Sequence, residues 1–148
     1  MLTPRPLTDS LSVAPQIEEA DIAQAKALGF RTIINNRPDG EEPGQLTSTR
    51  AAELAKEAGL DYVYLPVNNM NLGPQTAAAF AEALAKLPGP VLAHCRSGTR
   101  STILWSLGAA ASGTPVNDII TAAGRQGYDL SPYAHALENL ARENLARG

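Results

Sequence analysis

The chain has 148 residues, the usual size of one domain, and a hydrophobic content of 44%, which is ordinary for a globular protein. Its net charge of −3 and the lack of basic stretches interleaved with aromatic residues argue against a nucleic-acid-binding protein. A single cysteine excludes an intramolecular disulfide, and no pair of histidines has metal-ligand spacing, so we expect no metal and no other cofactor.

No apolar run approaches the ~18 residues that a membrane-spanning helix needs, so we expect no membrane span. Residues 1–13 lack a basic start followed by an apolar core, which argues against a signal peptide. A lone thiol without an export signal is typical of a reducing compartment, and we therefore predict a cytoplasmic protein.

Segments with helical and strand-like patterns alternate along the N-terminal half. Apolar residues recur at helical spacing in the helices, β-branched residues mark the strands, and turn-forming residues mark the loop. In chain order we expect an edge strand at 11–13, a helix at 18–28 that ends before Gly29, a buried strand at 32–35, a loop at 36–44, a helix at 47–58 that ends before Gly59 and a strand at 62–65.

The C-terminal half continues this alternation and adds three helices after the last strand. In chain order we expect a polar loop at 68–73, a helix from Pro74 to about residue 87, a short buried strand at 91–94, an almost wholly apolar helix at 101–111, a helix that starts at Thr114-Pro115 and a C-terminal helix at 132–147. Strands separated by helices predict an α/β protein: a small, mostly parallel sheet flanked by helices, in one domain that covers residues 1–148.

The only cysteine, Cys95, directly follows a predicted buried strand and precedes a short loop and a helix. In open α/β sheets, ligand sites form at the carboxyl ends of the strands. The backbone N–H groups of this loop lie at a helix N-terminus, where the helix dipole favours an anion or a thiolate. We therefore predict that Cys95 is a nucleophile, mostly thiolate at neutral pH, in an anion-binding loop.

Several neighbours of Cys95 have expected roles in this loop. Gly98 lets the loop curl without a clash from a Cβ atom. Arg100 offers a planar fork to an oxyanion and is the second catalytic candidate. Ser101 is expected to hydrogen-bond the sulfur. The other predicted members of the anion-binding loop are Arg96, Ser97 and Thr99.

The run from Cys95 to Ser101 resembles the active loops of two families. Single-domain rhodaneses, which carry sulfur as a cysteine persulfide, have the same spacing between cysteine and arginine. Protein tyrosine phosphatases have a similar loop that is one residue longer. Their histidine before the cysteine corresponds to His94, and the resemblance implies that it holds the loop through hydrogen bonds; a core histidine satisfied by the backbone is the alternative.

Three further stretches, at 29–44, 62–67 and 127–131, carry a second resemblance together with the cysteine loop. Over nearly the whole chain they resemble the phosphatase-like domain of the bacterial beta-lactamase hydrolase-like proteins. This resemblance implies a fold of the protein tyrosine and dual-specificity phosphatase type. Related domains occur fused to persulfide dioxygenases, which implies sulfur chemistry.

The two chemistries differ in their need for an acid. Phosphatases must protonate a leaving group, and the resemblance places that acid in the loop at 68–73. This loop contains no carboxylate, and its Asn71 is a candidate only for contacting the substrate or supporting the site. Thiosulfate releases sulfite, which needs no acid. The short loop and the missing acid favour a rhodanese-type sulfurtransferase, in which Cys95 takes sulfur from thiosulfate or a low-molecular-weight persulfide and passes it to a thiol acceptor.

Two other functions stay open. The first is a phosphatase that forms a cysteinyl-phosphate intermediate with a phosphate ester. The second is a non-catalytic module that senses anions or persulfides. All three functions predict a small anionic ligand, whereas a thiol protein as acceptor is expected only for the sulfurtransferase.

Three charged residues outside the loop are further site candidates. Asp39 is the leading candidate for an acid supplied from elsewhere, although Pro-Asp-Gly is also an ordinary turn sequence. Asp129 is a second candidate, and alternatively it caps the last helix. Arg37 either contacts the substrate anion or braces its own loop through Glu41 or Glu42.

Overall fold

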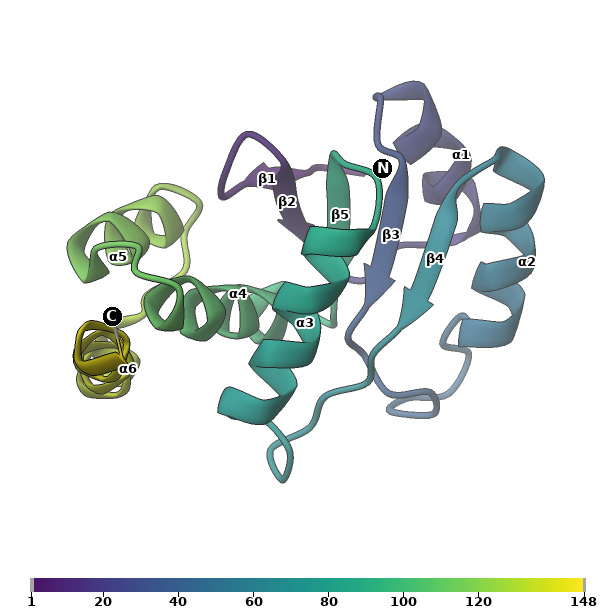
Figure 1. Cartoon of the computed structure of the whole chain (residues 1–148). Coiled ribbons are helices and arrows are strands. Elements are labelled where there is room, and N and C mark those ends of the chain that lie inside the picture. Colours follow the sequence, from purple (N-terminus) through teal and green to yellow (C-terminus); the bar gives the residue numbers. More distant parts are fainter. Residues whose placement is uncertain (1, 148) are drawn as a thin grey trace.

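The computed structural model describes residues 2–147 and contains a five-stranded sheet with helices on both faces (Figure 1). The α/β class and the mostly parallel sheet confirm the sequence-based prediction. Its elements are β1 (Arg5–Pro6), β2 (Leu11–Ala14), α1 (Glu19–Ala27), β3 (Thr32–Asn35), α2 (Ser48–Ala58), β4 (Asp61–Tyr64), α3 (Pro74–Lys86), β5 (Val91–His94), α4 (Thr99–Ala111), α5 (Val116–Arg125), a 3₁₀ turn (Ser131–Tyr133) and α6 (Ala134–Arg147).

The strand order in the sheet is β1-β2-β5-β3-β4, and only β1 runs antiparallel to its neighbour. The last residues of the parallel strands lie side by side, because Ala14 and Asn35 both pair with His94, and Tyr64 pairs with Asn35. The loops that follow these strands therefore meet at one edge of the sheet, where α/β proteins place their ligand sites.

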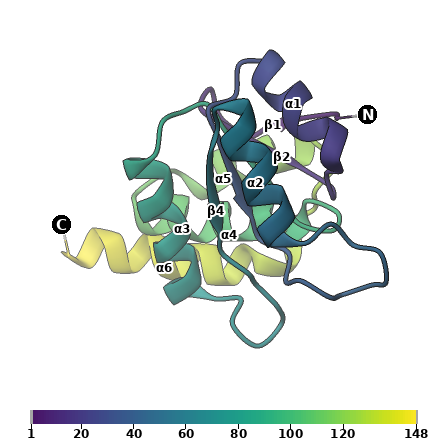
Figure 2. The ribbon, with the colours of Figure 1, turned by 90° about the vertical axis from the view of Figure 1, so that its right-hand side faces the viewer.

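The two faces of the sheet pack against different helices. On one face, Ile33 and Leu92 join the core formed with α1 and α2. On the other face, Ile34 and Ala93 join the larger core formed with α3, α4, α5 and α6. Figure 2 views the molecule from the side of α1 and α2. Successive strand residues thus serve opposite cores, which explains why these strands are apolar throughout rather than alternating.

Helix α4 is the central helix of the larger core and packs against α3 and α6. Its polar residues Thr102 and Ser106 are buried and donate hydrogen bonds to carbonyl groups of Gly98 and Ile103, at 2.8 Å and 2.7 Å. The helix begins at Thr99, earlier than the predicted start at residue 101, because Gly98 adopts a left-handed conformation and serves as its N-cap. The first turn of α4 therefore belongs to the cysteine loop.

Two small elements differ from the prediction. Strand β1 was not predicted because it has only two residues, and it exists through pairing with β2. The residues Ser131–Tyr133 form a 3₁₀ turn, so the last helix begins at Ala134 instead of residue 132. Within residues 2–147, no helix combines the length and apolar character that crossing a membrane requires.

Candidate active site

Cys95 lies immediately after β5, with its side chain fully buried. The backbone N–H of Gly98 points back at Sγ, with a donor-to-sulfur distance of 3.1 Å. The loop therefore closes around the sulfur and directs at least one N–H dipole toward it. A sulfur in this position gains most from the N-terminal end of α4 when it carries a negative charge.

Gly98 has a φ of +94°, in the region that favours glycine. Tyr128, on the segment after α5, packs directly against it, and its hydroxyl donates to the carbonyl of Ser97 at 3.0 Å. Arg5 donates to the same hydroxyl at 3.0 Å and lies over the ring. Tyr128 thereby fastens the cysteine loop to the segment after α5 and, through Arg5, to β1.

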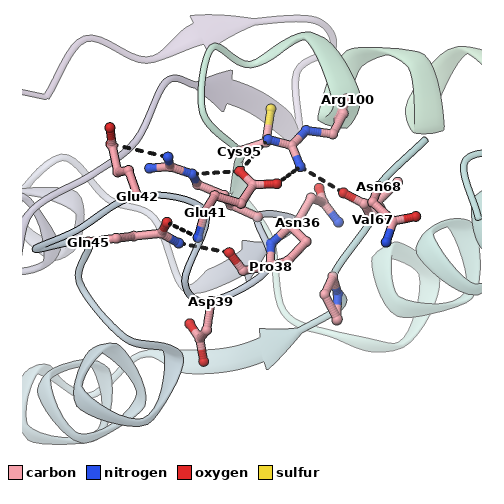
Figure 3. A network of polar contacts seen from close by, with 12 residues as sticks. Asn36, Pro38, Asp39, Glu41, Glu42, Gln45, Val67, Asn68, Cys95 and Arg100 are labelled. Carbon is pink, nitrogen blue, oxygen red and sulfur yellow. Dashed lines mark hydrogen bonds and ion pairs between the residues drawn. The ribbon is translucent and has the colours of Figure 1, made fainter. Parts of the chain in front are cut away.

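Arg100, in the first turn of α4, points into the space beside Cys95 (Figure 3). Its Nη1 donates to Glu41 Oε2 at 2.7 Å and to the carbonyl of Val67 at 2.8 Å, while its Nη2 donates to Glu41 Oε1 at 2.8 Å. The hydrogen bond with Glu41 raises the pKa of Arg100, and the nearby charge of Cys95 adds to that rise. The guanidinium is therefore a fixed cation next to the sulfur.

Glu41 is the carboxylate at the centre of this network. Its Oε1 also accepts from Arg37 Nε at 2.8 Å, so two guanidinium groups share one carboxylate. The pKa of Glu41 is lowered to about 2, and the largest cause is the hydrogen bond from Arg100. The hydrogen bond from Arg37 also lowers the pKa, whereas burial raises it. Glu41 is consequently an anion at neutral pH.

Arg37 braces its own loop and does not line the pocket. The side chain is fully buried and donates to Gln16 Oε1 at 3.2 Å and to Glu41, with Glu42 as a further ion-pair partner at 3.1 Å. Gln16 in turn donates its backbone N–H to the carbonyl of Arg96. Of the two roles predicted for Arg37, the brace is the one that its contacts support.

A pocket of about 450 Å³ opens beside the cysteine loop, and its lining is polar. The residues that line it are Glu41, Asn68, Asn69, Arg96 and Arg100. Cys95 is buried beneath the loop and does not itself line the pocket. Two arginines among the lining residues suit a small anion, which is the kind of ligand that the sequence predicted, and Glu41 is the only carboxylate among the lining residues.

Ser101 does not bond the sulfur as predicted. Its hydroxyl donates to Asn36 Oδ1 at 2.8 Å, and both side chains are buried. The reason is the strand order: β3 lies next to β5, so the residue after β3 faces the first turn of α4. Thr99 and Ser97 are exposed and hydrogen-bond each other through their hydroxyls at 2.9 Å.

Asp39, the predicted acid, is not brought to the sulfur. Its two carboxylate oxygens accept from the backbone N–H and the hydroxyl of Ser48, at 2.8 Å and 2.7 Å. Figure 3 shows the side chain pointing away from Cys95. In this position Asp39 stabilises the N-terminus of α2, a structural role that neither the predicted acid nor the turn sequence indicated.

The other polar candidates also have structural partners. Asn71 closes its own loop, since its Oδ1 accepts from the backbone of Asn68 at 2.7 Å and its Nδ2 donates to the carbonyl of Pro66. Asp129 is exposed and accepts from the backbone N–H of Ser131 at 2.9 Å, at the start of the 3₁₀ turn and not at the start of the last helix, which it was expected to cap. Neither side chain lines the pocket beside Cys95.

His94 is buried behind the cysteine, at the end of β5. Burial lowers the pKa of His94 to about 4, against a hydrogen bond with the backbone of Cys95 that raises it. The ring is therefore neutral at physiological pH. Its Nδ1 has no hydrogen-bond partner among the described residues.

The sequence alone did not identify Glu41, Tyr128 or Gln16 as parts of the site. Glu41 entered the prediction only as a partner of Arg37, and Tyr128 only as part of a stretch that resembles a family. One signal was present: an arginine and a glutamate four residues apart in a loop rich in Pro, Asp and Gly. That spacing predicts a local pair but says nothing of Arg100, which is 59 residues away.

Comparisons with known proteins identify the family of this chain. The profile of the family "Beta-lactamase hydrolase-like protein, phosphatase-like domain" matches residues 4–112. The beta-lactamase hydrolase-like protein of Agrobacterium fabrum is 39% identical over 133 residues, which are 89% of this chain and 31% of that protein. The chain spans about a third of the length of the curated relatives that it matches.

Solved structures share the fold. A protein of Neisseria meningitidis described as a candidate phosphatase is 34% identical, with a TM-score of 0.82 over 91% of this chain and 96% of that chain. Kinase associated phosphatase, with its catalytic-site cysteine changed to serine, is 14% identical, with a TM-score of 0.73 over 99% of this chain and 96% of that chain, which shows the fold alone. The chain thus belongs to the family of the phosphatase-like domain of beta-lactamase hydrolase-like proteins, and its fold is that of protein tyrosine and dual-specificity phosphatases.

Proposed function

We propose that this protein is a cysteine-dependent phosphatase that acts on small phosphate esters. The observation that carries the proposal is the placement of Cys95 and Arg100, at the junction of β5 and α4, next to a polar pocket on a phosphatase-like fold. This assignment replaces sulfur transfer, which the spacing of the loop favoured, as the leading function. The relatives and structural neighbours give sulfur transfer no support.

In the proposed reaction the Cys95 thiolate attacks phosphorus, and the bond from phosphorus to the ester oxygen breaks. The loop N–H groups and Arg100 stabilise the charge on the non-bridging oxygens. The ester oxygen leaves with the bonding electron pair and takes a proton from water. Water then attacks the cysteinyl phosphate, which releases inorganic phosphate and restores the thiolate.

The substrate class follows from the carboxylates near the pocket. Glu41 is held by two arginines with a pKa of about 2, and Asp39 is engaged by Ser48. Within residues 2–147 no other carboxylate lines the pocket, so no side chain there is suited to donate a proton at neutral pH. We therefore infer a preference for esters with acidic leaving groups, such as aryl phosphates.

The test uses the purified chain with aryl phosphates whose leaving phenols differ in acidity. Phosphate release that increases steeply with the acidity of the phenol, and that the variant Cys95→Ser abolishes, supports the proposal. A cysteinyl-phosphate adduct trapped by rapid acid quench and located on Cys95 by mass spectrometry identifies the nucleophile. Absence of release from every aryl phosphate would falsify the assignment.

Sulfur transfer remains the second candidate because of two observations. Four residues separate Cys95 from Arg100, as in single-domain rhodaneses, and the pocket lacks a free acid. Incubation with thiosulfate and cyanide tests it: gain of one sulfur atom on Cys95 with formation of thiocyanate supports sulfur transfer. A stable adduct without turnover in either assay instead supports a sensing module.

A further inference from the structure

The hydrogen bonds of Arg100 to oxygen atoms use only one end of its guanidinium, and the Cys95 side chain is a further hydrogen-bond partner. A guanidinium carries two N–H groups on each Nη atom and one on Nε. Glu41 Oε2 and the carbonyl of Val67 take both N–H groups of Nη1, and Glu41 Oε1 takes one of Nη2. Among the described residues no oxygen accepts from Nε or from the second N–H of Nη2. These two donors lie on the same edge and form a fork that fits two oxygens of an oxyanion.

We propose that Glu41 is the positioning residue that selects this edge of Arg100 for the substrate. This inference rests on the proposed function, in which Arg100 binds the phosphate oxygens beside Cys95. Glu41, which lines the pocket, and the carbonyl of Val67 together hold the end of the guanidinium. The Arg100 side chain is thereby held in one rotamer before the substrate binds, with its Nε edge available to the anion.

Arg37 makes this positioning possible. A glutamate in a turn-rich loop would otherwise lose conformational entropy on fixing Arg100, which makes exposed ion pairs weak. Here Glu41 Oε1 is already bonded to Arg37, whose side chain is fully buried and tied to Gln16. Gln16 also bonds the backbone of Arg96. The position of Glu41 is therefore set by a buried cation that is itself connected to the cysteine loop.

The burial of Cys95 also supports a positioning role for Glu41. The thiol is fully buried, and Arg96 and Arg100 line the pocket where Cys95 does not, so under this proposal a substrate must displace part of the loop to reach Sγ. During such a shift, the Glu41 contact retains one end of the Arg100 side chain. The other edge then follows the substrate oxygens, which keeps the cation in line with the sulfur.

The experiment separates charge from position with two substitutions. Glu41→Asp keeps the charge but is shorter by one methylene, so its carboxylate cannot bridge Arg37 and Arg100 in the same way. Glu41→Gln keeps the length and removes the charge. The neighbouring Glu42→Gln is the matched control, because Glu42 pairs with Arg37 and Arg96 but does not contact Arg100. Circular dichroism and thermal unfolding establish that each variant is folded.

Tungstate binding by calorimetry and turnover of an aryl phosphate are measured on all four proteins. We expect Glu41→Asp to weaken tungstate binding about ten-fold and to lower kcat about a hundred-fold, the scale on which a small misplacement affects catalysis. Glu41→Gln should lower kcat by a similar factor for every leaving group, whereas Glu42→Gln should have a much smaller effect on both quantities.

Four results would overturn the proposal. Tungstate binding as tight as in the wild type, or tighter, in both Glu41 variants would make Glu41 a competitor of the substrate instead. A loss in Glu41→Gln that grows as the leaving phenol becomes less acidic would make Glu41 the proton donor. A wild-type protein that binds no tungstate, or equal losses in Glu42→Gln, would also contradict it. If the wild type binds tungstate but hydrolyses no phosphate ester, the proposed function is wrong. In that case the tungstate affinities of the variants still test whether Glu41 positions Arg100.

Discussion

Gly98 and Tyr128 fit together so closely that position 98 has no room for a side chain: a Cβ there would lie 2.0 Å from the Tyr128 hydroxyl oxygen. The same hydroxyl bonds the carbonyl of Ser97 and accepts from Arg5. The curvature of the cysteine loop is thus fixed from inside by the left-handed conformation of Gly98 and from outside by Tyr128.

Gly98→Ala is expected to disrupt the loop. The new methyl group would meet the Tyr128 ring, and φ at +94° is strained for any residue with a Cβ. We expect a lower melting temperature and a loss of tungstate binding. Gly124→Ala in α5 is the control, because its Cβ would meet nothing within 4 Å and alanine favours a helix by about 0.5–1 kcal/mol. Unchanged tungstate binding in Gly98→Ala would contradict the role of the tight fit.

Tyr128→Phe keeps the ring against Gly98 and removes only the hydroxyl. Burial, as the largest cause, raises the pKa of Tyr128, so this hydroxyl stays protonated and can donate to Ser97 at neutral pH. We expect a loss of about 1 kcal/mol of stability in urea unfolding, the usual value of one hydrogen bond, and a several-fold lower kcat. Tyr133→Phe serves as the control, since the Tyr133 hydroxyl has no hydrogen bond within residues 2–147. Equal effects of the two substitutions would show that the Tyr128 hydroxyl does not hold the loop.

Asp39→Ala should lower stability more than turnover. Its carboxylate bonds both the backbone N–H and the hydroxyl of Ser48 at the start of α2. Loss of such a cap costs about 1 kcal/mol. Thr47→Ala, which removes the other cap of the same helix, should have a similar effect on the urea midpoint. A fall in kcat in Asp39→Ala but not in Thr47→Ala would instead support the role of catalytic acid that the sequence predicted for Asp39.

The buried His94 predicts a pH dependence of stability. Its pKa is lowered to about 4 in the folded protein, whereas an unfolded histidine has a pKa of about 6.5. Between these values the unfolded chain binds a proton that the folded protein does not, so stability falls as the pH drops through this window. Urea unfolding at about pH 7 and about pH 5 measures the fall. His94→Gln should reduce the difference and the exposed His135→Gln should not; equal slopes in all three proteins would refute the assignment.

Much of the fold followed from local patterns. The strands β3 and β5 and the helix α4 were predicted because their apolar residues form uninterrupted or helical patterns. These patterns are local and do not depend on the order of the strands in the sheet. Strand β1 was missed because a two-residue strand has no periodicity and exists only through its partner β2. The early start of α4 was missed because it depends on the conformation of one residue, Gly98.

The candidate site divides in the same way. The roles of Cys95, Gly98 and Arg100 were inferred from consecutive residues between a strand and a helix, where spacing alone determines proximity. Two predictions were wrong: that Ser101 bonds the sulfur and that Asp39 is the acid. The hydrogen-bond partners of these side chains depend on which distant segments pack beside them. In the folded protein Asn36 and Ser48 were nearer.

The sequence by itself determined the strand, loop and helix that carry Cys95, because those residues are adjacent and their backbone preferences are local. Only the tertiary structure decided which charges meet at that loop. Placing β3 between β5 and β4 brings the 36–42 loop against the first turn of α4, and Glu41 meets Arg100 across 59 residues of chain. Coulombic pairing and hydrogen bonding act between groups that are close in space. Residue spacing in the sequence cannot predict contacts that depend on the order of the strands in the sheet.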